Sequence, residues 1–144
     1  MELDINKKLK QALYAHNQGK FEEAEKLYQE ILKTDPRHAK ATHNFGVLKV
    51  SMDIAVDALP LFKIATEIDP NIEQFWISYA DALFNENKLE EAKISYRKAI
   101  ELKSNNFKTH NKLGITLNRL DKLVEAILSF KKAIELKPNH PQAY

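Results

Sequence analysis

The sequence predicts an all-α solenoid, a stack of antiparallel helix pairs. Prolines stand at Pro36, Pro70 and Pro138, and Ser104 stands where a further proline would complete the series. We call these four positions the proline marks; each lies 34 residues from the next. A fixed period of this length indicates repeated supersecondary units stacked on one another. The 144 residues include only three glycines and five prolines, a scarcity that favours long helices over hairpins.

The proline mark, taken as position 32 of a unit, divides the chain into four repeats, residues 5–38, 39–72, 73–106 and 107–140. Position 20 is alanine in every repeat: Ala24, Ala58, Ala92 and Ala126. Position 24 is always aromatic: Tyr28, Phe62, Tyr96 and Phe130. Position 15 holds a turn-forming or capping residue: Gly19, Asp53, Asn87 and Asp121. We predict a single domain over residues 1–144, with residues 141–144 opening a truncated fifth unit.

Each unit is expected to contain a helix, a turn near position 15, a second helix and a stop. Leu89, Ala92 and Tyr96 share one face of a helix because they are three and four residues apart. A proline after a helix ends it, since the residue before proline is driven away from helical geometry. Pro60 departs from this scheme, and we expect either a helix that starts late, near an Asp57 cap, or a kinked one.

With these residues in register, the chain resembles the tetratricopeptide repeat family over essentially its whole length. The third repeat carries the family marks Trp76, Ala80, Ala92, Tyr96 and Ala99, and the fourth carries Leu113, Gly114, Ala126, Phe130, Ala133 and Pro138. The resemblance implies a right-handed superhelix that acts as a non-enzymatic scaffold for protein–protein interaction. Residues 70–83 also look like repeats that precede bacterial glycosyltransferase or sulfotransferase domains. The alternative is therefore the N-terminal recruiting or targeting arm of a larger enzyme that continues beyond Tyr144.

Neither the composition nor the motifs support another functional class, such as a nucleic-acid-binding protein, a metalloprotein or an enzyme. The net charge of +2 is too small to indicate nucleic-acid binding. The chain has no cysteine, and no two of its five histidines have the spacing of a helical zinc site. We find no signal peptide and no apolar run of membrane-spanning length, so we expect a cytoplasmic protein without a membrane partner. No cofactor, metal or catalytic residue is expected.

The family resemblance also implies a binding surface. Positions 2, 5, 6, 9, 12 and 13 of the first helices line a concave groove in the family. The residues that we assign to a peptide-binding groove on this basis are Lys10, Lys40, His43, Asn44, Val47, Val50, Ile77, Asp81, Phe84, Lys108, Asn111, Lys112, Asn118 and Arg119.

This stripe has an apolar middle, Val47, Val50, Ile77 and Phe84, flanked by amides and cations. We therefore expect a protein or peptide partner with apolar anchors and acidic flanks, the cations mainly raising the rate of encounter. The alternative interpretation is that this stripe is a solvent-exposed helix face without a ligand. A further alternative is a homo-oligomer formed by end-to-end stacking, because a fourth repeat without a polar capping helix leaves an apolar face open.

Overall fold

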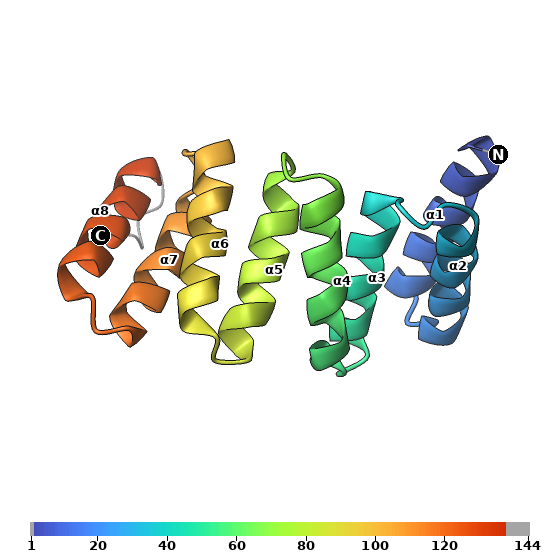
Figure 1. Ribbon diagram of the computed structural model, residues 1–144, viewed down its shortest axis with the longest axis horizontal. Helices are drawn as coiled ribbons and strands as arrows, with labels where there is room; N and C mark the ends of the chain where they lie inside the picture. The colour runs from blue at the N-terminus through green and yellow to red at the C-terminus, as the bar shows by residue number, and fades with distance from the viewer. Residues whose placement is uncertain (1, 138–144) are drawn as a thin grey trace. The chain divides into compact units, whose positions relative to one another are not determined.

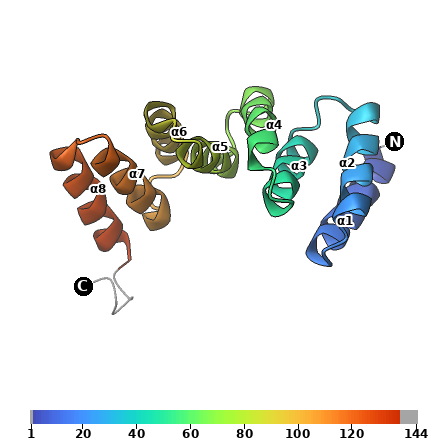
Figure 2. The ribbon, with the colours of Figure 1, turned by 90° about the horizontal axis from the view of Figure 1, so that it is seen from below.

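The computed structural model describes residues 2–137, which form eight α-helices. They are α1 (Glu2–Asn17), α2 (Phe21–Thr34), α3 (Ala39–Ser51), α4 (Ala55–Ile68), α5 (Glu73–Asn85), α6 (Leu89–Leu102), α7 (Phe107–Arg119) and α8 (Leu123–Leu136). Successive helices pack as antiparallel pairs, α1 with α2, α3 with α4, α5 with α6 and α7 with α8 (Figure 1). Figure 2 shows the same pairing in a second view. The predicted all-α, paired-helix fold is confirmed.

The chain divides into two compact units, Met1–Pro70 with α1–α4 and Asn71–Tyr144 with α5–α8. In the first unit α3 packs against α2 and also contacts α1, and in the second unit α7 packs against α6. Each unit thus contains two helix pairs. The single domain over residues 1–144 stays a prediction.

The turn inside each pair is built on a left-handed residue. Gly19, Asp53, Asn87 and Asp121 all have φ between 60° and 75°. The residue after each of them donates its backbone N–H to a carbonyl five residues back, as Lys88 does to Leu83 at 2.8 Å. This bond caps the first helix of the pair. Glycine, asparagine and aspartate are the residues that adopt this conformation most readily, which explains position 15.

The second helices end where the proline mark predicts. α2 and α4 end two residues before Pro36 and Pro70, and α6 ends two residues before Ser104; Pro138 lies outside the described residues. Pro60 sits inside α4, which begins at Ala55, so the late start near Asp57 is wrong. Because proline has no N–H, the carbonyl of Val56 loses its helical donor. Val56 and Pro60 are both exposed, so this carbonyl lies on the solvent side of α4.

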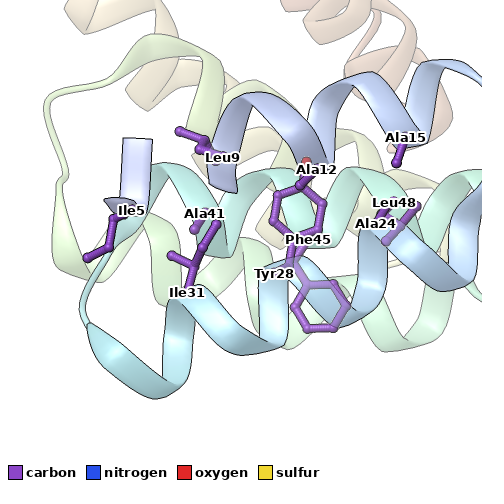
Figure 3. Close-up of a cluster of buried hydrophobic side chains, with 10 residues drawn as sticks. All are labelled: Ile5, Leu9, Ala12, Ala15, Ala24, Tyr28, Ile31, Ala41, Phe45 and Leu48. Carbon is purple, nitrogen blue, oxygen red and sulfur yellow. The ribbon is translucent and has the colours of Figure 1, made fainter. Parts of the chain in front are cut away.

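The core of the first unit lies where α3 meets the α1–α2 pair. Tyr28 and Phe45 stack with ring centroids 5.8 Å apart, and Leu48 is fully buried beside them. Figure 3 shows these side chains surrounded by Ile5, Leu9, Ile31 and several alanines. Alanines at the helix crossings let the backbones approach, and the rings fill the space that remains.

The second unit repeats this arrangement with a polar junction between its helix pairs. Leu113 and Leu117 of α7 are buried, as are Tyr96 and Ala99 of α6. His110 stands at the family's tryptophan mark and is buried; its ring Nε2 lies 2.7 Å from the carbonyl oxygen of Ser104. At the start of α7, the Asn106 side chain donates to Glu73 at 3.2 Å, which places the beginnings of α5 and α7 side by side.

Two repeats pair a glycine with a phenylalanine, and two pair an alanine with a tyrosine. At positions 8 and 24 the pairs are Ala12 with Tyr28, Gly46 with Phe62, Ala80 with Tyr96, and Gly114 with Phe130. A Cβ added to either glycine would lie 2.6 Å from its phenylalanine ring. In these two repeats a larger residue at position 8 therefore fits only if the phenylalanine ring moves.

Candidate functional site

The residues assigned to the groove differ widely in exposure. In the first unit Lys10, Lys40 and Val50 are exposed, Asn44 and Val47 are half-buried, and His43 is buried. In the second unit Lys108, Asn111, Asn118 and Arg119 are exposed, Asp81, Phe84 and Lys112 are half-buried, and Ile77 is buried. His43 and Ile77 both occupy position 5, and their burial leaves them almost no surface for a ligand. Leu9, at position 5 of the first repeat, is also buried and belongs to the core.

Three of the assigned residues meet in one pocket of the second unit. This α5–α7 pocket has a volume of about 320 Å³ and is lined by Asp81, Phe84, Asn85, Tyr96, Lys112 and Ile115. Phe84 and Ile115 supply an apolar floor. Asn85 is exposed at its edge and offers both a donor and an acceptor.

Asp81 holds the polar wall of this pocket together. Its carboxylate accepts a hydrogen bond from the Tyr96 hydroxyl. It also forms an ion pair with Lys112, whose Nζ lies 2.9 Å from the Asp81 Oδ2. Burial, together with the hydrogen bond to Asp81 and its charge, raises the pKa of Tyr96. The Lys112 ammonium is thus already paired, although both partners remain more than a third exposed and such a pair is worth only about 0–1 kcal/mol.

Arg119 is also engaged by its neighbours. Its guanidinium lies 4.9 Å from the centre of the Phe84 ring and donates to the Asn87 side chain at 3.1 Å. The planar guanidinium covers the ring and shields part of the apolar floor. A peptide entering the α5–α7 pocket would displace or stack on this side chain.

A larger pocket lies at the other side of α7. This α7–α8 pocket has a volume of about 520 Å³ and is lined by Phe107, Lys108, Asn111, Lys112, Phe130, Ala133, Ile134 and Lys137. Lys108, Asn111 and Lys112 were assigned to the groove from the sequence, whereas the five other residues were not. The signal for them was the apolar face that the fourth repeat leaves open, which sequence reasoning noted without naming its residues.

Within residues 2–137 two tyrosines are buried, and the different surroundings of their hydroxyl groups give a testable difference. Tyr28 is fully buried, its pKa is raised to about 12 by burial, and its hydroxyl has no hydrogen-bond partner among the described residues. Its repeat carries Leu13 where the third repeat carries Asp81. We expect Tyr28→Phe to leave the free energy of unfolding unchanged or raise it by about 1 kcal/mol, and Tyr96→Phe to lower it by about 1 kcal/mol. Urea titration followed by circular dichroism measures both, and equal losses would contradict this difference.

The burial of His43 predicts that acid destabilises the fold. Burial lowers the pKa of His43, which is partly offset by a side-chain hydrogen bond to Asn44. The unfolded chain therefore binds a proton at a higher pH than the folded chain does, and stability falls as the pH drops below the ordinary histidine value of about 6.5. We expect His43→Leu to remove part of the stability difference between pH 7.5 and pH 5.5, measured from urea midpoints. A pH dependence identical to that of the wild type would rule out this role for His43.

The other described histidines have structural partners. The His16 Nε2 lies 2.8 Å from the Ser51 hydroxyl, and the His38 Nδ1 accepts from the backbone of Ala41 at 3.1 Å; His140 lies outside the described residues. Residues 2–137 contain no group of three or more histidine, aspartate or glutamate side chains placed to hold a metal ion. Within the same residues, every helix is too short or too polar to cross a bilayer.

The comparisons with known proteins agree with this fold. Models of the tetratricopeptide repeat match residues 9–47, 80–121 and 107–140. The chain belongs to the tetratricopeptide repeat family, a class of protein-interaction repeats. No curated protein sequence matches it significantly.

Solved structures show the same fold. The MamA protein matches with a TM-score of 0.91 and 22% identity, over 100% of this chain and 79% of that one. MamA from Desulfovibrio magneticus RS-1 matches with a TM-score of 0.84 and 22% identity, over 95% and 77%. YrrB, described as a TPR protein with an unusual peptide-binding site, matches with a TM-score of 0.81 and 20% identity, over 92% and 68%.

Proposed function

We propose that this chain is a non-enzymatic scaffold that binds a peptide segment on the surface of its first helices. The observation that carries the proposal is the α5–α7 pocket, where an apolar floor of Phe84 and Ile115 is bordered by amide and charged side chains. Such a combination suits an extended peptide, since the floor takes one apolar anchor and the amides bond to its backbone. YrrB is described as a TPR protein with an unusual peptide-binding site, and this supports the proposal that the present chain binds a peptide.

The charge expected of the peptide depends on which lysine and arginine side chains of this chain are free to pair with it. Lys112 and Arg119 are engaged by Asp81 and Phe84, so a peptide carboxylate would have to compete for them. In the same unit Lys108 is exposed, and among the described residues it has no carboxylate within ion-pair distance. A peptide with an acidic flank would use this lysine chiefly to speed its approach, and its binding would weaken with salt.

The test is a binding titration with an extended probe. The probe is a fluorescent peptide with leucine and valine anchors, a central proline that prevents helix formation, and aspartate and glutamate at both ends. We expect Phe84→Asp to abolish the anisotropy change that the wild-type chain produces. Ile94→Asp is the matched control, because Ile94 is an exposed apolar residue of α6 that lines neither pocket. Equal binding by Phe84→Asp and Ile94→Asp would remove the pocket from the proposal.

The charge contribution needs its own variant. Lys112→Glu combined with Arg119→Glu places two carboxylates beside the pocket and should weaken binding of the acidic probe, most strongly at low salt. Unchanged binding would show that charge has no part in recognition. The recruiting-arm and end-to-end alternatives stay predictions.

A further inference from the structure

Three polar side chains of the α5–α7 pocket form one hydrogen-bonded network. The Asp81 Oδ1 accepts from the Tyr96 hydroxyl, and the Asp81 Oδ2 lies 2.9 Å from the Lys112 Nζ. Asp81 stands at position 9 and Tyr96 at position 24 of the third repeat, whereas Lys112 stands at position 6 of the fourth. The network therefore joins two successive repeats within the second unit.

The first unit packs without such a network. Its first two repeats carry Leu13 at position 9 and Asn44 at position 6. Tyr28, at position 24, is fully buried there, and its hydroxyl has no hydrogen-bond partner among the described residues. Since the same helix pairing forms around Tyr28, the network of the second unit is not a requirement of the fold. Its position in a pocket indicates a role toward a ligand.

The Asp81–Lys112 pair keeps hydrogen-bonding capacity on both partners. A carboxylate offers about four acceptor sites and an ammonium offers three donors. Within the described residues, each oxygen of Asp81 accepts one bond, and the Lys112 ammonium donates to Asp81 alone. Both side chains line the pocket and are more than a third exposed. A ligand therefore meets an acceptor and a donor whose atoms lie 2.9 Å apart.

A primary carboxamide matches this pair better than a charged group does. Its N–H can donate to Asp81 while its C=O accepts from Lys112, and hydrogen bonds to charged partners are the stronger kind. A ligand carboxylate would be attracted by Lys112 but repelled by Asp81. A ligand ammonium would be attracted by Asp81 but repelled by Lys112 and by Arg119, which covers Phe84. The uncharged amide avoids both conflicts.

The apolar floor sets the length of the side chain that carries this amide. Phe84 and Ile115 line the pocket together with the ion pair, so a side chain that reaches the pair lays its methylene groups on them. Glutamine has two methylenes before its amide and asparagine has one, while serine has one methylene and a single oxygen for both bonds. Glutamine therefore satisfies the floor and the pair together.

We propose that the α5–α7 pocket binds a glutamine side chain of the peptide, with its amide between Asp81 and Lys112 and its methylenes on the apolar floor. The inference rests on the proposed function and names the side chain that the pocket prefers. Tyr96 acts as a positioning residue, because its hydrogen bond holds the Asp81 carboxylate in place. The peptide backbone lies at the edge of the pocket, where Asn85 is exposed.

The experiment compares four fluorescent peptides against the whole chain. Each keeps the central proline and acidic ends of the extended probe and carries one anchor, which is glutamine, methionine, leucine or glutamate, with alanine elsewhere. Methionine is the matched control for glutamine, since it is unbranched and similar in length but has no amide. We expect the glutamine peptide to bind about tenfold more tightly than the methionine peptide, as one or two added hydrogen bonds allow. The glutamate peptide should bind more weakly than the glutamine peptide.

Asp81→Leu should reverse the preference between glutamine and glutamate. Leu13 occupies the same position above the buried Tyr28, so the fold accepts leucine there. The substitution removes the repelling carboxylate and leaves Lys112 unpaired, so the glutamate peptide should now bind more tightly than the glutamine peptide. Binding of the leucine peptide should persist and shows that the pocket is intact. Ile94→Asp, outside the pocket, should keep the wild-type order of the four peptides.

Tyr96→Phe tests the positioning role. It should reduce the advantage of the glutamine peptide over the methionine peptide while leaving the leucine peptide unaffected, because only the glutamine peptide uses the Asp81 carboxylate. A merely structural role of the hydroxyl would weaken the binding of all these peptides alike.

The outcomes separate this inference from the proposed function. If the leucine and methionine peptides bind, Phe84→Asp abolishes their binding and glutamine brings no gain, the groove holds and this inference fails. It also fails if the wild-type chain binds the glutamate peptide most tightly, or if Asp81→Leu keeps the wild-type order. Binding of none of the four peptides would overturn both proposals.

Discussion

Leu48→Ala is expected to lower the free energy of unfolding by about 2–5 kcal/mol. Leu48 is fully buried in α3, in the cluster that joins α3 to the α1–α2 pair. The close packing of helices around it leaves little freedom to collapse into the cavity, so the loss includes a cavity contribution as well as the lost transfer free energy. Leu128→Ala is the control, because Leu128 is 61% exposed and its truncation should cost less than about 0.5 kcal/mol. Similar losses for the two variants would contradict this packing.

The same variant also tests the predicted single domain. Trp76 is the sole tryptophan of the chain and lies in α5, in the unit that does not contain Leu48. In a single cooperative domain, Leu48→Ala shifts the urea midpoint of Trp76 fluorescence as far as it shifts the midpoint of circular dichroism. A fluorescence midpoint that stays in place would show that the two units unfold separately.

Gly46→Ala is expected to destabilise the fold by about 1–2 kcal/mol. The new Cβ would lie 2.6 Å from the Phe62 ring, which is buried and must be displaced. Overpacking of this kind costs about 1–3 kcal/mol, and the higher helix propensity of alanine offsets up to about 1 kcal/mol of that cost. Thermal and urea unfolding of the purified variant measure the net change.

Gly114→Ala provides the matched comparison. Its Cβ would also lie 2.6 Å from a ring, that of Phe130, but this ring is only half-buried and borders the α7–α8 pocket. The ring can turn into the pocket, so the gain in helix propensity dominates and the variant should be as stable as the wild type or more so. Equal destabilisation by the two substitutions would show that the ring of Phe130 is as fixed as that of Phe62.

The fold could be predicted from the sequence because it depends on periodic local signals. The proline marks, the alanines of position 20 and the turn residues of position 15 each act within one repeat, and four copies in phase leave little ambiguity. Pro60 is informative here: the sequence allowed a late start for α4, but the packing of its helix pair sustains the helix from Ala55 onward. Tertiary contacts outweighed the local cost of a missing hydrogen bond.

The candidate site was less predictable because it depends on contacts between repeats. The groove positions came from one helical stripe, and a stripe does not show that position 5 is buried, as Ile77 is. Nor does it show that Lys112 pairs with Asp81, or that Arg119 covers Phe84. The charge count of the stripe therefore overstated the cations that are available to a ligand in the α5–α7 pocket.

The alternation of Ala–Tyr and Gly–Phe pairs has a consequence for how such a chain is inherited. A recombination event that falls between positions 8 and 24 would place an alanine opposite a closely approaching phenylalanine, or a glycine opposite a tyrosine. Crossovers that fall between repeats keep each pair intact. Each of the two compact units contains one pair of each kind. Duplication of a two-repeat module would therefore reproduce the alternation in one step, and it makes this module the natural unit for exchange and for the construction of longer arrays.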